Sequence, residues 1–196
     1  MKCLLIILIV FVNVVNSDTT KRLLLPQLPI GEYRLKPLAI LRCELSQVNN
    51  LIKINYYLSK TSTNTTEIKG NFTNLVPLDD SFNVEINMAV KDSVGGWKDN
   101  AHIFKSPKAC SSLKNVLGNI YNRVLDNLGM HNIRGCPIPV GCYVSSGMKN
   151  NDELYSNLPK QFFYGTYKLR FQFTKNKIVH GCVTYILEVK RPWETD

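Results

Sequence analysis

Three histidines and two pairs of neighbouring acidic residues are the side chains best suited to catalysis or metal binding. His102, His131 and His180 stand alone, without a cysteine or glutamate at the spacing of a known metal motif. The acidic pairs at 79–80 and 152–153 lie beside proline, serine or asparagine, where solvated turn residues are the ordinary interpretation. No Gly-x-Ser-x-Gly nucleophile motif occurs. We therefore expect a non-enzyme with no catalytic residue, no metal and no cofactor.

Cysteine usage is the second chemical signal. Cys3 lies in an apolar N-terminal run, and the remaining five are Cys43, Cys110, Cys136, Cys142 and Cys182. Because no Cys-x-x-Cys pair occurs, these residues indicate disulfides formed in an oxidising compartment rather than a zinc site. The simplest arrangement is two disulfides and one free thiol.

The first 17 residues have the pattern of a signal peptide. Lys2 supplies the positive charge, residues 4–15 supply the apolar core, and the predicted cleavage lies before Asp18. This core is far shorter than the roughly 20 apolar residues that a membrane span needs. We expect a secreted, extracellular product with an N-terminal arm over 18–32 and one domain over 33–193.

The predicted mature chain is basic and carries two glycosylation motifs. Without Lys2 it has 23 basic and 15 acidic residues, a net charge of +8. This charge favours anionic partners such as a lipid headgroup or a membrane surface, although solubility alone also explains it. Export and the scattered basic residues argue against nucleic acid. The motifs at Asn64 and Asn71 are candidate glycosylation sites.

Alternation of apolar and polar residues predicts mostly β-strands. The clearest case is 82–90, where every second residue is apolar. The run 167–174, a turn at 175–177 and the run 179–189 predict a hairpin. Candidate strands lie near 33–45, 51–59, 65–76, 81–91, 95–105, 139–146, 162–174 and 178–190. Their number and spacing favour a mainly β protein with two antiparallel sheets.

One segment has the period of a helix instead. From Leu113 to Leu128, apolar residues recur at steps of three and four, which predicts an amphipathic helix over 111–128. Ser111 or Ser112 is the expected N-cap, and Gly129 follows the expected end. We expect this helix to lie at the rim of the β-structure and to gate ligand entry, because its other face is polar.

Four motifs near the C-terminus occur in a characteristic order. They are Gly135-Cys136-Pro137-Ile138-Pro139-Val140-Gly141-Cys142-Tyr143, then Leu158-Pro159, Tyr164-Gly165-Thr166-Tyr167 and Gly181-Cys182-Val183. Their order and spacing resemble the ganglioside activator branch of the MD-2-related lipid-recognition (ML) superfamily. Within that branch the chain looks most like the insect chemosensory proteins of the B type. The resemblance covers residues 80–193 and is weak before them.

The resemblance implies a fold and a disulfide pattern. The fold is an immunoglobulin-like β-cup, in which two antiparallel sheets part around an apolar cavity and a helix lies at the rim. The implied disulfides are Cys43–Cys182 and Cys110–Cys136. Cys142 departs from the family pattern. We expect a buried thiol there, and a bond to Cys136 or to another molecule is the alternative.

The implied function is to carry or present an apolar ligand, either a lipid or a long-chain hydrocarbon such as a pheromone. We expect a monomer that meets a chemosensory receptor or an anionic membrane surface. A lipid-extracting activator of a hydrolase and a ligand-free interaction module are the alternatives. The expected ligand contacts lie on the inward strand faces and the helix, at Ile54, Tyr56, Val84, Ile86, Met88, Ile120, Val124, Leu169, Phe171 and Phe173.

Overall fold

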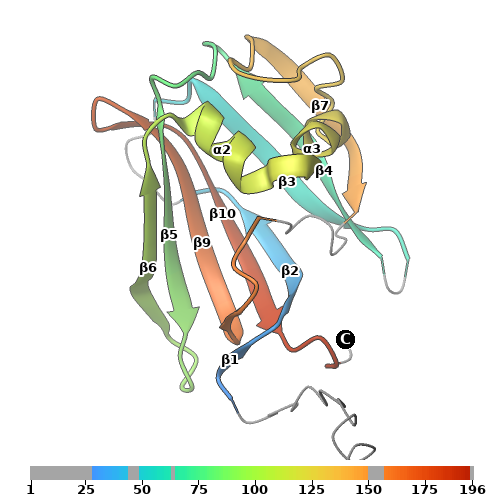
Figure 1. The fold of residues 1–196 in the computed structure, drawn as a ribbon, viewed down its shortest axis with the longest axis vertical. Coiled ribbons are helices and arrows are strands. Elements are labelled where there is room, and N and C mark those ends of the chain that lie inside the picture. The colour runs from blue at the N-terminus through green and yellow to red at the C-terminus, as the bar shows by residue number, and fades with distance from the viewer. Residues whose placement is uncertain (1–27, 44–48, 63–64, 150–156, 195–196) are drawn as a thin grey trace, which may run out of the picture.

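A computed structural model describes residues 28–43, 49–62, 65–149 and 157–194. The predicted signal peptide, residues 18–27 of the predicted arm and the Asn64 motif lie outside the described residues. Two large antiparallel sheets and one helical segment make up most of the described chain (Figure 1). The prediction of a mainly β, antiparallel protein with one helical segment is therefore confirmed.

The larger sheet has five strands in the order β2-β10-β9-β5-β6. In chain order its strands are β2 (Arg34–Leu41), β5 (Asn83–Lys91), β6 (Trp97–Ser106), β9 (Gly165–Lys175) and β10 (Ile178–Lys190). The predicted hairpin is β9 and β10. Apolar residues of neighbouring strands face one another, since Val84 lies opposite Phe173 and Ile86 opposite Phe171. The alternating pattern thus produces one continuous apolar face.

The smaller main sheet has three strands in the order β3-β4-β7. They are β3 (Ile52–Lys60), β4 (Thr66–Asn74) and β7 (Gly141–Lys149). β3 lies against both β10 and β2 of the larger sheet. In Figure 1 the helices lie across the space between the two sheets.

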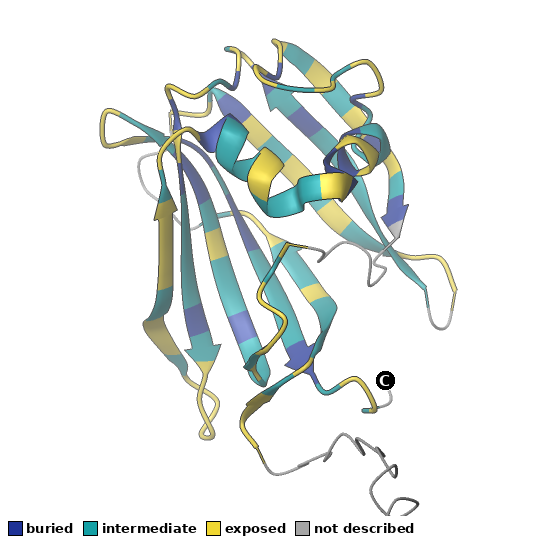
Figure 2. Ribbon diagram, viewed as in Figure 1, coloured by how far each residue is buried: buried dark blue, intermediate teal, exposed yellow. Residues whose placement is uncertain are grey.

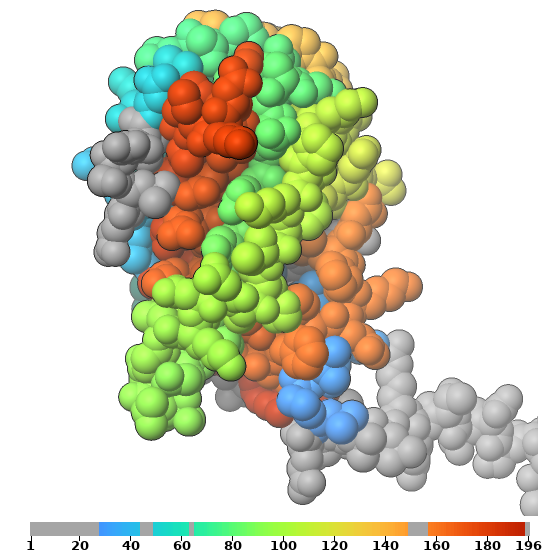
Figure 3. Space-filling model, turned by 90° about the vertical axis from the view of Figure 1, so that its left-hand side faces the viewer, coloured from blue at the N-terminus to red at the C-terminus, as the bar shows by residue number. Residues whose placement is uncertain are grey.

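A third, two-stranded sheet joins the start of the described chain to a late segment. β1 (Ile30–Gly31) pairs with β8 (Phe162–Phe163). Figure 3 shows the blue residues of this N-terminal segment against the orange segment that contains β8, below the main body. The two-sheet expectation did not include this pair.

The helical segment differs from the predicted single helix. It consists of α2 (Ala109–Leu117), a 3₁₀ turn η1 (Gly118–Ile120) and α3 (Tyr121–Asn127). Gly118 has φ 53°, and a Cβ there would lie 2.0 Å from Nδ2 of Asn157, which donates to the Asn115 carbonyl at 2.9 Å. A side chain at position 118 is therefore disfavoured by the backbone conformation and would displace the Asn157 side chain from its hydrogen bond. This break ends the first helix after Leu117.

The predicted N-cap is also wrong. α2 begins after Lys108, whose side chain makes no capping hydrogen bond. Asp80 performs this task from another part of the chain, because its carboxylate accepts from the Ser111 backbone N–H at 2.9 Å and from the Ser111 hydroxyl at 2.6 Å. Asp80 is an exposed turn residue, as expected, and these two hydrogen bonds also hold the start of the helix, while the acidic pair at 152–153 lies outside the described residues.

The main core lies where the two large sheets approach each other. It combines Ile52 and Phe72 from the smaller sheet with Val84 and Phe173 from the larger one. Figure 2 shows the buried positions gathered on the strands and on the inner side of the helices. At Gly181 the approach is close, because a Cβ there would lie 2.7 Å from both Cβ and the carbonyl oxygen of Ile52.

No helix among the residues that the structure describes has the length and apolar character of a membrane span.

Candidate ligand-binding cavity

Two disulfides anchor the segments around the space between the sheets. Cys43 pairs with Cys182 on β10, and Cys110 at the start of α2 pairs with Cys136. These are the two pairs implied by the sequence resemblance. Cys142 is free, as expected, but it is exposed rather than buried, and its thiol accepts from the Thr73 hydroxyl at 3.4 Å.

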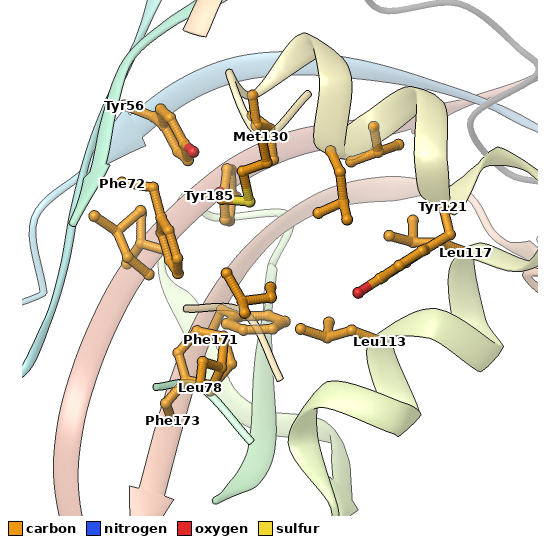
Figure 4. Close-up of a pocket in the computed structure, with 16 residues that line it drawn as sticks. Tyr56, Phe72, Leu78, Leu113, Leu117, Tyr121, Met130, Phe171, Phe173 and Tyr185 are labelled. Atoms are coloured by element: carbon orange, nitrogen blue, oxygen red, sulfur yellow. The ribbon is translucent and has the colours of Figure 1, made fainter. Parts of the chain in front are cut away.

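An apolar cavity of about 190 Å³ lies between the two main sheets and the helical segment (Figure 4). Both sheets, both helices and the segment after α3 contribute to its walls. The lining residues are Ile54, Tyr56, Phe72, Leu78, Leu113, Leu117, Tyr121, Val124, Leu125, Leu128, Met130, Ile138, Phe171, Phe173, Val183 and Tyr185. The described lining residues thus include no charged side chain.

Five of the ten predicted contact residues line this cavity. They are Ile54 and Tyr56 from β3, Phe171 and Phe173 from β9, and Val124 from α3. The alternating strand pattern places the first four on inward faces. Each of the three walls, the two sheets and the helical segment, therefore contains at least one residue that the sequence singles out.

The other five predicted contact residues lie outside the cavity lining. Val84 is buried in the main core and Ile86 packs against that core. Met88 and Leu169 are half-buried and lie opposite each other further along the same inner face. Ile120 is buried in a small cluster with Val124 and Met148, which attaches the helix to β7.

Eleven lining residues are absent from the predicted contacts. Five of them, Leu113, Leu117, Tyr121, Leu125 and Leu128, belong to the helical stripe found in the sequence. After the break at Gly118, Tyr121 lines the cavity, whereas Ile120 packs in the cluster with Val124 and Met148. Phe72, Val183 and Tyr185 also lie in predicted strands. The alternation of apolar and polar residues is the only sequence feature that could have identified them as lining residues.

Tyrosine hydroxyls are the polar side-chain groups of the described lining residues. Among the residues that the structure describes, the hydroxyls of Tyr56 and Tyr121 are buried and have no hydrogen-bond partner. Burial raises the pKa of Tyr56, and the neighbouring Tyr185 raises it further. Burial also raises the pKa of Tyr121, and it raises that of Tyr185 to about 12. All three phenols are thus neutral at physiological pH.

The three histidines are dispersed across the fold. His102 stacks on Phe163 near the two-stranded sheet, with ring centroids 6.0 Å apart. His180 is buried with its ring edge-on to Phe82, and His131 is exposed. In the described ranges, no three histidine, cysteine or acidic side chains are grouped so that they could hold a metal ion.

The described glycosylation motif lies on a strand. Asn71 is on β4, and its side-chain oxygen accepts from Asn55 Nδ2 across the pair at 3.0 Å. Asn55 is exposed, so Asn71 faces the outside of the smaller main sheet.

No protein-family model matches the chain, and no curated protein matches its sequence.

Proposed function

We propose that this protein is a secreted carrier that holds a lipid or a long-chain hydrocarbon between its two main sheets. The observation that carries the proposal is the cavity, whose lining combines sixteen apolar or tyrosine side chains from both sheets and the helical segment. A cavity with such walls favours an apolar ligand, since each buried methylene contributes about 0.8 kcal/mol before entropic costs.

The proposal includes a β-cup fold of the ML superfamily, closest to the insect chemosensory proteins of the B type. The sequence motifs support this assignment, and the pairing of Cys43 with Cys182 and of Cys110 with Cys136 agrees with it. A chemosensory role then follows by analogy with those proteins.

The size of the cavity sets a condition on binding. At about 190 Å³ it exceeds the roughly 150 Å³ of an engineered apolar cavity that binds benzene, but typical ligand pockets have roughly 300–1,000 Å³. A long chain therefore needs additional room. Movement of the helical segment would supply it, and the half-buried side chains of Ile86, Met88 and Leu169 would extend the apolar wall.

Binding of the fluorescent probe N-phenyl-1-naphthylamine tests the proposal. We expect the delipidated protein to bind it. Leu113→Trp, which fills the cavity from α2, should weaken binding roughly tenfold, about 1.4 kcal/mol. The matched control Asn122→Trp, on the exposed side of α3, should bind as the wild type does.

Two results would redirect the proposal. Equal binding by Leu113→Trp and the wild type would place the probe outside the cavity. No binding by the wild type would favour a ligand-free interaction module. If the wild type binds the probe, mass spectrometry of lipids that co-purify with the native protein would identify the ligand class.

A further inference from the structure

The cavity contains two polar atoms that its apolar character does not explain. Tyr121 is only 3% exposed, and its hydroxyl lacks a hydrogen-bond partner among the described residues. The Tyr56 hydroxyl is buried and unpartnered in the same way. An unsatisfied buried hydroxyl costs about 1–3 kcal/mol, whereas phenylalanine has the same shape without this cost.

The two hydroxyls come from different walls and point into the same space. Tyr56 is on β3 of the smaller sheet, and Tyr121 begins α3. Figure 4 shows both hydroxyl oxygens directed away from their own backbones and toward the cavity. A ligand in the cavity would therefore pass within reach of donors on two sides.

The chemistry of the walls limits the partner of these donors. A neutral phenol donates its proton to an acceptor, and burial keeps these phenols neutral. The described lining residues carry no positive charge, and Lys114, whose Nζ lies 6.0 Å from the centroid of the Tyr121 ring, is outside that lining. A carboxylate drawn between the sheets would therefore have no charged partner among the lining residues. A plain hydrocarbon would leave both hydroxyls unsatisfied.

We propose that the cavity selects a long-chain ligand with a neutral hydrogen-bond acceptor in its apolar body, such as a ketone or ester oxygen, bound by the Tyr56 and Tyr121 hydroxyls. This inference rests on the proposed carrier function. It adds a ligand class, the neutral oxygenated hydrocarbons, and assigns the two tyrosines as specificity-determining residues.

Displacement of N-phenyl-1-naphthylamine by dodecan-6-one and by dodecane tests the proposal. Each ligand is measured on the wild type, Tyr56→Phe, Tyr121→Phe and the double variant. Comparing proteins for the same ligand removes the difference in water solubility between the two ligands. We expect the double variant to lose about tenfold in affinity for the ketone, with dodecane unchanged or bound slightly more tightly.

Tyr143→Phe is the matched control. Its hydroxyl donates to the Pro139 carbonyl at 2.9 Å and lies outside the cavity lining, so neither ligand should change in affinity. The melting temperature of the ligand-free Tyr56→Phe and Tyr121→Phe variants should be equal to or higher than that of the wild type, since each loses an unsatisfied hydroxyl.

The outcomes separate this inference from the function on which it rests. If the double variant binds the ketone as tightly as the wild type does, or loses the same factor for both ligands, the selectivity is overturned while the carrier function stands. If the wild type binds neither the probe nor the ligands, both proposals fall.

Discussion

The space between the two main sheets has two ends. Both are lined by apolar strand faces, but the sheets are in contact at one end and leave a cavity at the other. At the closed end, defined by Ile52 and Gly181, β3 approaches β10 so closely that no Cβ fits at position 181. At the cavity end, Ile54 and Tyr56 of β3 and their β10 neighbours stand apart, and the helical segment enters between them.

This difference shows what alternation along a strand does and does not determine. Ile52, Ile54 and Tyr56 follow one another on the same inward face of β3. Ile52 is 1% exposed and belongs to the closed core, whereas the other two line the cavity. The distance between the sheets, and not the pattern of either strand, decides which apolar residues line the cavity.

The largest expected effect is the loss of the disulfide at the closed end. The Cys43–Cys182 bond closes a sequence separation of 139 residues and the Cys110–Cys136 bond one of 26. On the chain-entropy model they contribute about 5 and about 3.5 kcal/mol, respectively. We expect urea unfolding to show the greater loss for Cys43→Ser/Cys182→Ser.

The cavity-end pair should show the opposite ranking in ligand binding. Cys110→Ser/Cys136→Ser loosens a wall of the cavity, so this variant should lose more affinity for the probe. The comparison fails if the closed-end variant loses more affinity while both remain folded.

A methyl group at position 181 tests how tightly the closed end is packed. Gly181→Ala places a Cβ against the Ile52 backbone carbonyl, which cannot move independently of β3. We expect a loss of about 1–3 kcal/mol in the free energy of unfolding. Gly135→Ala is the control, since nothing lies within 4 Å of the position that its methyl group would occupy, and its stability should be unchanged. Equal stability of the two variants would show that the sheets part without cost.

The removal of a single methylene separates stability from ligand exchange. Ile52→Val at the closed end and Ile120→Val within the helical segment make the same chemical change at buried sites. Each should lower the free energy of unfolding by about 1 kcal/mol. Only Ile120→Val loosens the contact between the helix and β7, so only this variant should speed probe release in stopped-flow displacement. Faster release from both variants would mean that the whole fold, rather than the helix, controls entry.

Strand positions could be predicted well because their signal is local. The run 178–190 predicts β10 with its observed bounds, and the run 81–91 predicts β5 to within two residues. The helix break could not be predicted, because the apolar stripe continues through Gly118. What disfavours a side chain there is partly Asn157, which is distant in the sequence and close only after folding.

The candidate site could be predicted only in part for the same reason. The strand pattern identifies Phe171 and Phe173 as inward-facing, and both line the cavity. It identifies Val84 and Ile86 equally well, although neither residue lines the cavity. Separating the two groups requires the distance between the sheets, which depends on contacts such as Ile52 with Gly181.

The smallest expected effect concerns the point where the helical segment is fixed to the closed end. Asp80 lies two residues before Phe82, whose ring is edge-on to that of His180, the residue next to Gly181. The Asp80 carboxylate accepts two hydrogen bonds from Ser111. The Ala109 backbone N–H adds a bond to the Phe82 carbonyl at 2.8 Å. This attachment holds the start of α2 while the later part of the segment lines the cavity.

The hydrogen bonds from the Ser111 hydroxyl and backbone N–H lower the pKa of Asp80, and Lys108 adds to this effect. A lowered pKa in the folded state means that the carboxylate stabilises the fold at pH values above its unfolded pKa of about 3.9. That contribution is lost as the pH falls through the folded-state pKa. Asp80→Ala should therefore melt at a lower temperature than the wild type at pH 7, and the difference should shrink below about pH 4.

Hydrogen exchange locates the effect of this substitution. In Asp80→Ala the backbone amides at the start of α2 should exchange faster, because the Ser111 N–H loses its acceptor. Asp79→Ala is the matched control, since the Asp79 carboxylate accepts from Ser81 instead, and it should leave α2 protected. If the melting difference between Asp80→Ala and the wild type does not depend on pH, the ionised carboxylate does not hold the helix. The start of α2 would then be held by the Cys110–Cys136 bond and the Ala109 backbone hydrogen bond alone.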